Sequence, residues 1–128
     1  MRFFFDNNLS PKIARALNCL VQPEHEVIHL RERFAPGTPD AEWMRILAGE
    51  MDWVIISADT AISRNPHEVQ AWKEAGHPIF FFKHSLAQQP FWQQASRLCR
   101  VFPDIIRLAS RAGPGDSFQI PVKGAIER

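Results

Sequence analysis

Short apolar runs alternate along the chain with longer segments that carry apolar residues at helical spacing. Three of the runs, residues 3–5, 54–56 and 78–82, contain only apolar side chains. A strand with one exposed face alternates apolar and polar residues, so unbroken runs of this length are typical of strands buried on both faces. The runs therefore predict the central strands of a parallel sheet.

Two further segments complete the predicted sheet. Residues 27–30 form a short run rich in β-branched side chains, and residues 117–122 alternate apolar and polar side chains. Pro121 lies in the second segment and cannot donate a ladder hydrogen bond, so we expect that strand at the edge of the sheet.

Helices are predicted between the strands, and their ends carry recognisable signals. Ser10 before Pro11, and Thr38 before Pro39, each fit an N-cap followed by proline at the first helical position. A third helix is predicted over residues 66–76, where a glycine marks the end.

The last helical segment covers residues 90–110 and contains Pro103, which we expect to kink or divide it. It also carries Trp92, Leu98 and Phe102, an apolar stripe that could face a partner chain. Strands and helices thus alternate along the chain. This order predicts an α/β fold, a three-layer α/β/α sandwich with a mainly parallel central sheet and helices on both faces.

Composition adds few constraints. The chain has 128 residues, 45% of them hydrophobic, which suits a single domain over residues 1–128. The net charge of +1 does not indicate a nucleic-acid binder, although a local basic patch stays open. The sequence shows no membrane-spanning run and no secretory signal, and we expect Cys19 and Cys99 to be buried thiols. A cytoplasmic protein is therefore expected.

Four acids lie where strands end or the following helices begin. Asp6 closes the first strand, Asp59 follows the third, and Asp40 with Glu42 opens the second helix. Parallel strands bring these positions to one edge of the sheet. Clustered carboxylates repel one another unless a cation lies between them, and Mg²⁺ or Mn²⁺ prefers oxygen ligands. Such a site can activate water for phosphodiester hydrolysis.

Each acid also has a simpler interpretation. An Asp at a strand–helix junction often caps the helix or forms a turn. Asp40 and Glu42 can favour the positive end of a helix dipole. The grouping of the acids at one edge, rather than any single residue, favours a metal site.

Residues 3–11, Phe-Phe-Phe-Asp-Asn-Asn-Leu-Ser-Pro, resemble the opening of PIN-like proteins, specifically a short branch that includes VapC-like toxins. The resemblance continues through residues 25–30, 37–42 and 53–59, so it covers roughly the first half of the chain. It implies a PIN-like domain over residues 1–128 and Mg²⁺- or Mn²⁺-dependent cleavage of RNA. It also implies an antitoxin partner and a homodimer.

The resemblance implies that Asp6, Asp40 and Asp59 are the catalytic acids and metal ligands, and that Asn8 orients water or phosphate. Asn7 stands where relatives often carry Glu, and no further Asp follows Asp59. The next helix could supply the missing oxygen ligand from Asn65 or Glu68. These departures leave open a catalytically silent module that binds RNA or protein.

A receiver-like or phosphatase-like domain would also place an Asp after its first strand. Such a phosphatase needs a second acid two residues later, where this chain has Asn8. A receiver needs an acidic pair near the first strand, which Arg2 with Asp6 does not supply. The sequence therefore favours the nuclease interpretation.

Five basic residues follow strands or lie in loops near the predicted acidic edge, where they could bind RNA phosphates or be solvated loop charges. They are Arg31, Arg33, Arg64, Lys83 and His84. The four tryptophans are expected in the core or at an interface rather than stacked on bases. They are Trp43, Trp53, Trp72 and Trp92.

Overall fold

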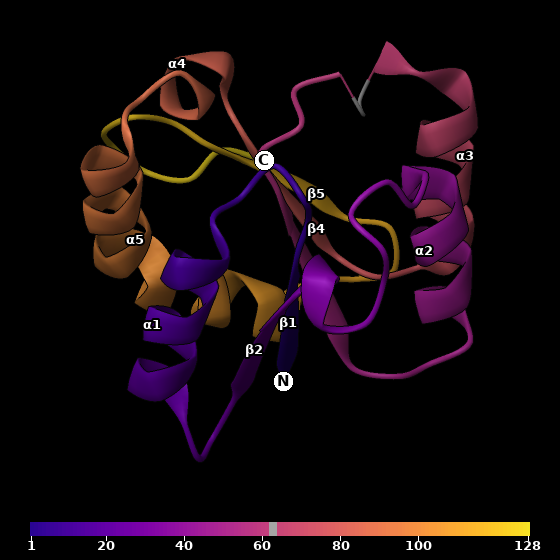
Figure 1. The fold of residues 1–128 in the computed structure, drawn as a ribbon, viewed down its shortest axis with the longest axis horizontal. Helices are drawn as coiled ribbons and strands as arrows, with labels where there is room; N and C mark the ends of the chain where they lie inside the picture. Colours follow the sequence, from indigo (N-terminus) through magenta and orange to yellow (C-terminus); the bar gives the residue numbers. More distant parts are fainter. Residues whose placement is uncertain (62–63) are drawn as a thin grey trace.

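The computed structural model describes residues 1–61 and 64–128 (Figure 1). Five strands form one sheet in the order β2-β1-β3-β4-β5, and every neighbouring pair is parallel. The strands are β1 (Arg2–Phe5), β2 (Glu26–His29), β3 (Trp53–Ser57), β4 (Ile79–Phe82) and β5 (Ser117–Ile120). The predicted α/β sandwich with a parallel central sheet is confirmed, and β5 lies at an edge as Pro121 indicated.

Helices cover both faces of the sheet, as Figure 1 shows. On one side lie α1 (Pro11–Val21) and α5 (Phe91–Arg111), and on the other lie α2 (Asp40–Ala48) and α3 (Pro66–Ala75). A one-turn helix, α4 (His84–Ala87), follows β4, and a short 3₁₀ turn, η1 (Leu30–Glu32), follows β2.

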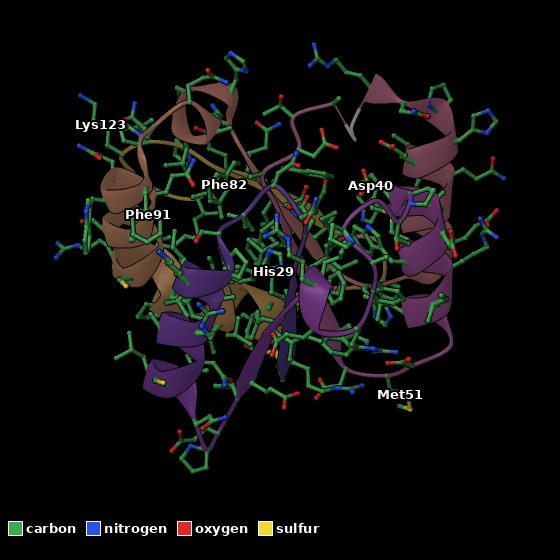
Figure 2. The ribbon with its side chains drawn as sticks, viewed as in Figure 1. His29, Asp40, Met51, Phe82, Phe91 and Lys123 are labelled. Carbon is green, nitrogen blue, oxygen red and sulfur yellow. The ribbon has the colours of Figure 1, made fainter. Side chains whose placement is uncertain are left out.

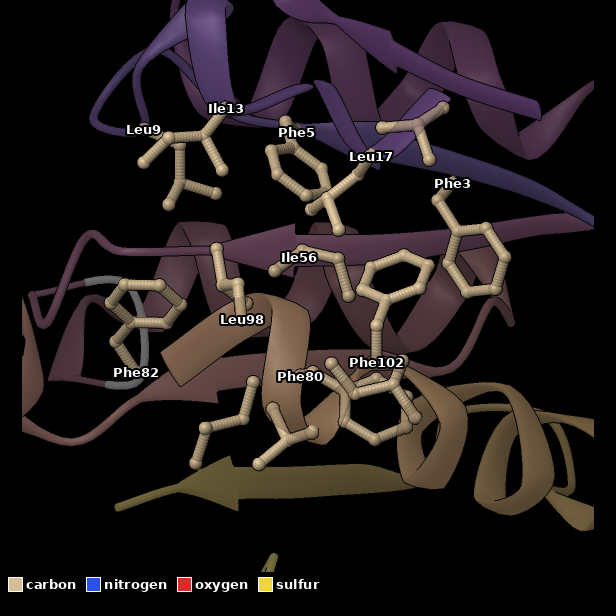
Figure 3. Close-up of a cluster of buried hydrophobic side chains, with 14 of the residues drawn as sticks. Phe3, Phe5, Leu9, Ile13, Leu17, Ile56, Phe80, Phe82, Leu98 and Phe102 are labelled. Carbon is tan, nitrogen blue, oxygen red and sulfur yellow. The ribbon is translucent and has the colours of Figure 1, made fainter. Parts of the chain in front are cut away.

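Strand β1 shows why its apolar residues are consecutive. Successive strand residues point to opposite faces, so Phe3 and Phe5 pack under α1 and α5 while Phe4 packs under α2 and α3. Figure 3 shows the first of these two cores, with Phe5 beside Leu17 of α1 and Phe3 close to Phe102 of α5. Both faces of β1 are buried, so its carboxyl end is held firmly in place.

Two of the predicted helix ends are confirmed and one is wrong. Ser10 Oγ accepts a hydrogen bond from the Lys12 N–H at 3.1 Å, and Gly76 ends α3 with φ of 75°. Thr38 does not cap α2, because its hydroxyl donates to the Ala35 carbonyl at 2.8 Å within the preceding turn.

The structure tests several of the expectations for the long helix α5. Pro103 does not divide it, since the helix runs from Phe91 to Arg111 with Pro103 on its exposed side. Leu98 and Phe102 face the sheet rather than a partner chain, and this buried stripe holds the helix together across the proline. Cys99 on this helix and Cys19 on α1 are exposed thiols, not buried ones.

Beyond β5, the chain turns back along the free edge of the sheet. Gln119 and Glu127 exchange two backbone hydrogen bonds, at 2.6 and 2.8 Å. This return covers part of the unpaired edge of β5. Within residues 1–61 and 64–128, none of the helices combines the length and apolar character that crossing a bilayer requires.

Candidate metal and nuclease site

The site begins with the register between β1 and β3. Phe5 lies beside Ile56, so Asp6 comes directly next to Ser57 at the carboxyl end of the sheet. The Ser57 hydroxyl donates a short hydrogen bond to Asp6 Oδ2. The backbone N–H groups of Asn8 and Ala58 donate to Asp6 Oδ1 at 3.1 and 3.4 Å. Asp6 is thus a buried carboxyl group, 1% exposed, whose two oxygens both have protein partners.

Burial raises the pKa of Asp6 to about 6, against an ordinary value of 3.8. The negative charge of Asp59 raises this pKa further, whereas the hydrogen bonds from Ser57, Ala58 and Asn8 lower it. The charged form of Asp6 is therefore disfavoured unless a positive charge is close by.

Three other carboxylates meet in front of this buried acid. Asp40 comes from the first turn of α2, Asp59 from the segment after β3, and Glu68 from the first turn of α3. Each offers one oxygen, and these oxygens all lie within 4.8 Å of one another. Figure 2 places Asp40 in the same upper half of the molecule as Phe82, the last residue of β4.

The electrostatics of this group favour a cation. Burial raises the pKa of Asp40 to about 7, helped by the charges of Asp6 and Glu68 and by the Asp59 carboxyl within hydrogen-bonding reach. Burial and the charge of Asp59 also raise the pKa of Glu68. Three half-buried carboxylates with hard oxygen donors match the ligand preference of Mg²⁺ or Mn²⁺, so these residues fit such an ion.

Several neighbouring groups hold these acids in position. The Trp43 indole N–H donates to Asp40 Oδ1 at 2.9 Å. Ser57 Oγ accepts from the Asp59 N–H at 3.1 Å. Asn65 caps α3 by accepting from the Glu68 N–H at 3.4 Å, which fixes the helix start that carries Glu68. Asn65 thus acts on the helix rather than joining the three carboxylates.

Sequence reasoning missed two of these residues. Ser57 had a signal, since a polar side chain ends an otherwise apolar strand beside an acid. Trp43 had none, because its position fits the buried face of α2 equally well. Glu68 was named only as one of two possible additions, and the structure brings Glu68, not Asn65, to the carboxylates.

The remaining predicted polar residues lie around the acids in different ways. Glu42 is exposed on α2 and is not among the carboxylates that meet. Asn8 is exposed, and its backbone rather than its side chain contacts Asp6. Asn7 Oδ1 accepts from Arg31 Nε at 2.9 Å. Because Asn7 is neutral, Arg31 keeps its full positive charge at this edge, where a Glu would have neutralised it.

The loop between Asp6 and α1 is anchored by a buried histidine, labelled in Figure 2. His29 Nδ1 accepts from the Arg31 N–H at 3.1 Å, which leaves Nε2 to donate to the Leu9 carbonyl at 2.7 Å. Burial lowers the pKa of His29, in keeping with a neutral ring. This bond ties the loop after β1 to the end of β2.

Three of the predicted basic residues gather around a hollow of about 580 Å³ beside the acids. Arg64, Lys83 and His84 line it together with Thr60, which directly follows Asp59. Lys83 Nζ lies 2.7 Å from Glu127 Oε1, so the returning carboxyl-terminal segment already pairs with this cation.

Arg33 lies elsewhere. Its guanidinium forms a bidentate salt bridge with Glu50, at 2.8 Å to each carboxylate oxygen, and lies over the ring of Trp53. The hydrogen bonds from Arg33 lower the pKa of Glu50 to about 2. Trp53 begins β3, so Arg33 lies toward the amino end of the strands, away from the acids.

Comparison with known proteins identifies the family. A family model described as a PIN-like domain matches residues 1–84, which include Asp6, Asp40, Asp59 and Glu68. No curated protein and no solved structure matches the chain significantly. PIN-like domains are usually nucleases, and the acidic cluster at the carboxyl edge of the sheet is consistent with a hydrolase. From its sequence match and its fold, this chain belongs to the PIN-like domain family.

Proposed function

We propose that this PIN-like domain is a Mg²⁺- or Mn²⁺-dependent endoribonuclease and the toxin component of a toxin–antitoxin pair. One observation carries the nuclease part of the proposal: Asp40, Asp59 and Glu68 bring carboxylate oxygens within 4.8 Å of one another at the sheet edge. Like charges held this close, with raised pKa values at Asp40 and Glu68, form a site that a divalent cation stabilises.

Asp40, Asp59 and Glu68 would hold the cation, with Asp6 behind them. Asp6 stays a predicted ligand, and two contacts link it to the three: its charge raises the pKa of Asp40, and Ser57 joins its carboxyl group to the backbone of Asp59. When bound, a Mg²⁺ or Mn²⁺ ion supplies an activated water and neutralises charge that develops on the phosphate.

The basic hollow beside the acids gives the RNA backbone a place to bind. Arg64, Lys83 and His84 line it, and Arg31 adds a cation at the end of β2. Arginine and lysine side chains bind phosphate oxygens through charge-assisted hydrogen bonds. A strand held in the hollow would place one of its phosphodiesters near the carboxylates, because Thr60 joins the hollow to Asp59.

The test is cleavage of a single-stranded RNA by the purified protein with Mn²⁺. We expect cleavage by the unmodified protein and by Glu42→Gln, whose exposed carboxylate lies outside the cluster, and none by Asp59→Asn or in the presence of EDTA. Cleavage that persists in Asp59→Asn, or that needs no divalent cation, would refute the assignment.

One feature supports a second candidate, a catalytically silent RNA- or protein-binding module. Both oxygens of Asp6 accept hydrogen bonds from the protein, and Asn7 supplies no charge beside it. Such a module would bind RNA with no cleavage under any divalent cation, in the same assay.

The toxin assignment has its own test. Induced expression of the unmodified protein should arrest growth of the host cell, whereas Asp59→Asn should not. A small antitoxin-like gene beside this one would supply the partner, and its co-expression should restore growth. Unimpaired growth under induction of an RNase-active protein would remove the toxin role and leave the nuclease.

A further inference from the structure

Trp92 is the one tryptophan that the fold leaves in solvent. Its side chain is 78% exposed at the start of α5, whereas Trp43, Trp53 and Trp72 are buried. The exposed ring of Phe91 meets it edge-on, with centroids 5.3 Å apart. A large aromatic surface left in water is a candidate contact for a partner.

The indole forms one wall of a second hollow, of about 480 Å³. Most of the other lining residues carry hydrogen-bond donors, two of these residues are arginines, and none carries a carboxylate. They are Leu86, Gln89, Gln93, Ser96, Arg97, Arg100 and Val122. Arg97 is held in place by the carbonyl groups of Pro121 and Gly124, so part of this wall is preformed.

Consecutive residues of α4 line this hollow and the basic hollow of the candidate site. His84 and Ser85, in the first half of α4, line the basic hollow, and Leu86, in the second half, lines the hollow at Trp92. Residues of the same helical turn therefore line both hollows. Figure 2 shows Phe91 on the left of the molecule and Asp40 to the right of centre, with Phe82 between them.

We infer that Trp92 is a stacking platform for an unpaired base of single-stranded RNA, several nucleotides from the scissile bond. An exposed indole stacks on any base, and positive charge without carboxylates matches a phosphate backbone. Arg64 and Lys83 line the basic hollow, where Glu127 pairs with Lys83, and Arg97 and Arg100 line the hollow at Trp92. This inference rests on the proposed function, since it assigns a further part of the same RNA substrate.

Binding rather than cleavage tests it. The parent protein is Asp59→Asn, with Mg²⁺ present, and the probe is a labelled oligoadenylate of about 12 nucleotides, followed by fluorescence anisotropy. We expect Trp92→Ala to weaken binding about tenfold and Trp92→Phe to retain most of the affinity. RNA should also quench the tryptophan emission of the parent. Met51→Ala is the matched control, because Met51 is 84% exposed at the opposite edge.

The other outcomes each decide a different point. Unchanged affinity in Trp92→Ala, with binding still lost in Lys83→Ala, would overturn the stacking platform and leave the proposed function intact. No RNA binding by any variant would overturn both. A dimer in sedimentation that Trp92→Ala abolishes, with no effect on RNA affinity, would assign the face to a second copy of the chain and overturn the inference.

Discussion

Ser57 Oγ donates a hydrogen bond to Asp6 and accepts one from the Asp59 N–H at 3.1 Å. One hydroxyl group, itself fully buried, thus joins the acid after β1 to the backbone of the acid after β3. The register of two central strands sets this distance, and the loops have little freedom to change it. The carboxyl edge of the sheet is therefore a preformed scaffold for the carboxylates.

Ser57→Ala should lower both stability and activity. Its loss leaves Asp6 Oδ2 buried without its donor, which costs about 1–3 kcal/mol in the free energy of unfolding. Urea denaturation measures the change, with Ser110→Ala as control because Ser110 is exposed at the end of α5. Equal stability of the two variants would mean that the hydroxyl does not hold Asp6.

The pH dependence of stability should identify Asp6. Its pKa is about 6 in the folded protein and near the ordinary 3.8 when unfolded, so the folded state binds the proton more tightly. The contribution is present at low pH and is lost as pH rises through about 6, by up to about 3 kcal/mol.

The amide in Asp6→Asn does not titrate. The free energy of unfolding of this variant, relative to that of the unmodified protein, should therefore increase between about pH 4 and 7. Denaturation in EDTA across this range measures the difference. Asp40 adds to the gain in the same direction, because the charge of Asp6 raises its pKa. A constant difference at every pH would contradict the raised pKa of Asp6.

Substitution of two buried tryptophans distinguishes a role in positioning Asp40 from a role in packing alone. Trp43→Phe keeps a buried aromatic ring on α2 but removes the N–H that donates to Asp40. The affinity for Mn²⁺ should therefore fall about tenfold. Trp72→Phe is the control, because the Trp72 indole N–H has no hydrogen-bond partner among the described residues. Calorimetric Mn²⁺ titration of both variants gives the comparison, and equal affinities would remove the role of Trp43.

The architecture could be predicted from the sequence because its signals are local. Runs such as residues 3–5 indicate a strand that is buried on both faces, and N-cap residues such as Ser10 indicate where a helix begins. The convergence of Asp40 and Asp59 also followed, since parallel strands have one carboxyl edge.

What could not be predicted depends on contacts between distant segments. The burial of Asp6 requires the hydroxyl of Ser57 from another strand, and the pairing of Arg33 with Glu50 requires the path of the loop after η1. Both are settled by tertiary packing. The exposure of Trp92 also depends on tertiary packing. On a long amphipathic helix, a small rotation about the helix axis decides whether a residue faces the core or solvent.

The pairing of Lys83 with Glu127 predicts a gain of function. Glu127→Gln removes the carboxylate 2.7 Å from Lys83 and frees that cation for a phosphate. RNA affinity should rise at low salt, and the slope of log Kd against log salt should steepen by about one. Glu127→Gln combined with Lys83→Ala should show no such steepening, and Arg33→Ala should leave the slope as it was. A slope that Glu127→Gln leaves unchanged would show that Lys83 does not reach the RNA.

Titration of the protein with Mn²⁺ tests the metal site most directly. Glu68→Gln keeps the size of a side chain that meets Asp40 and Asp59, whereas Glu42→Gln makes the same change on an exposed residue outside the cluster. We predict that the unmodified protein and Glu42→Gln bind Mn²⁺ alike, and that Glu68→Gln binds it at least about tenfold more weakly. Equal affinity of the two variants, or no Mn²⁺ binding by the unmodified protein, would contradict a metal site built from these three carboxylates.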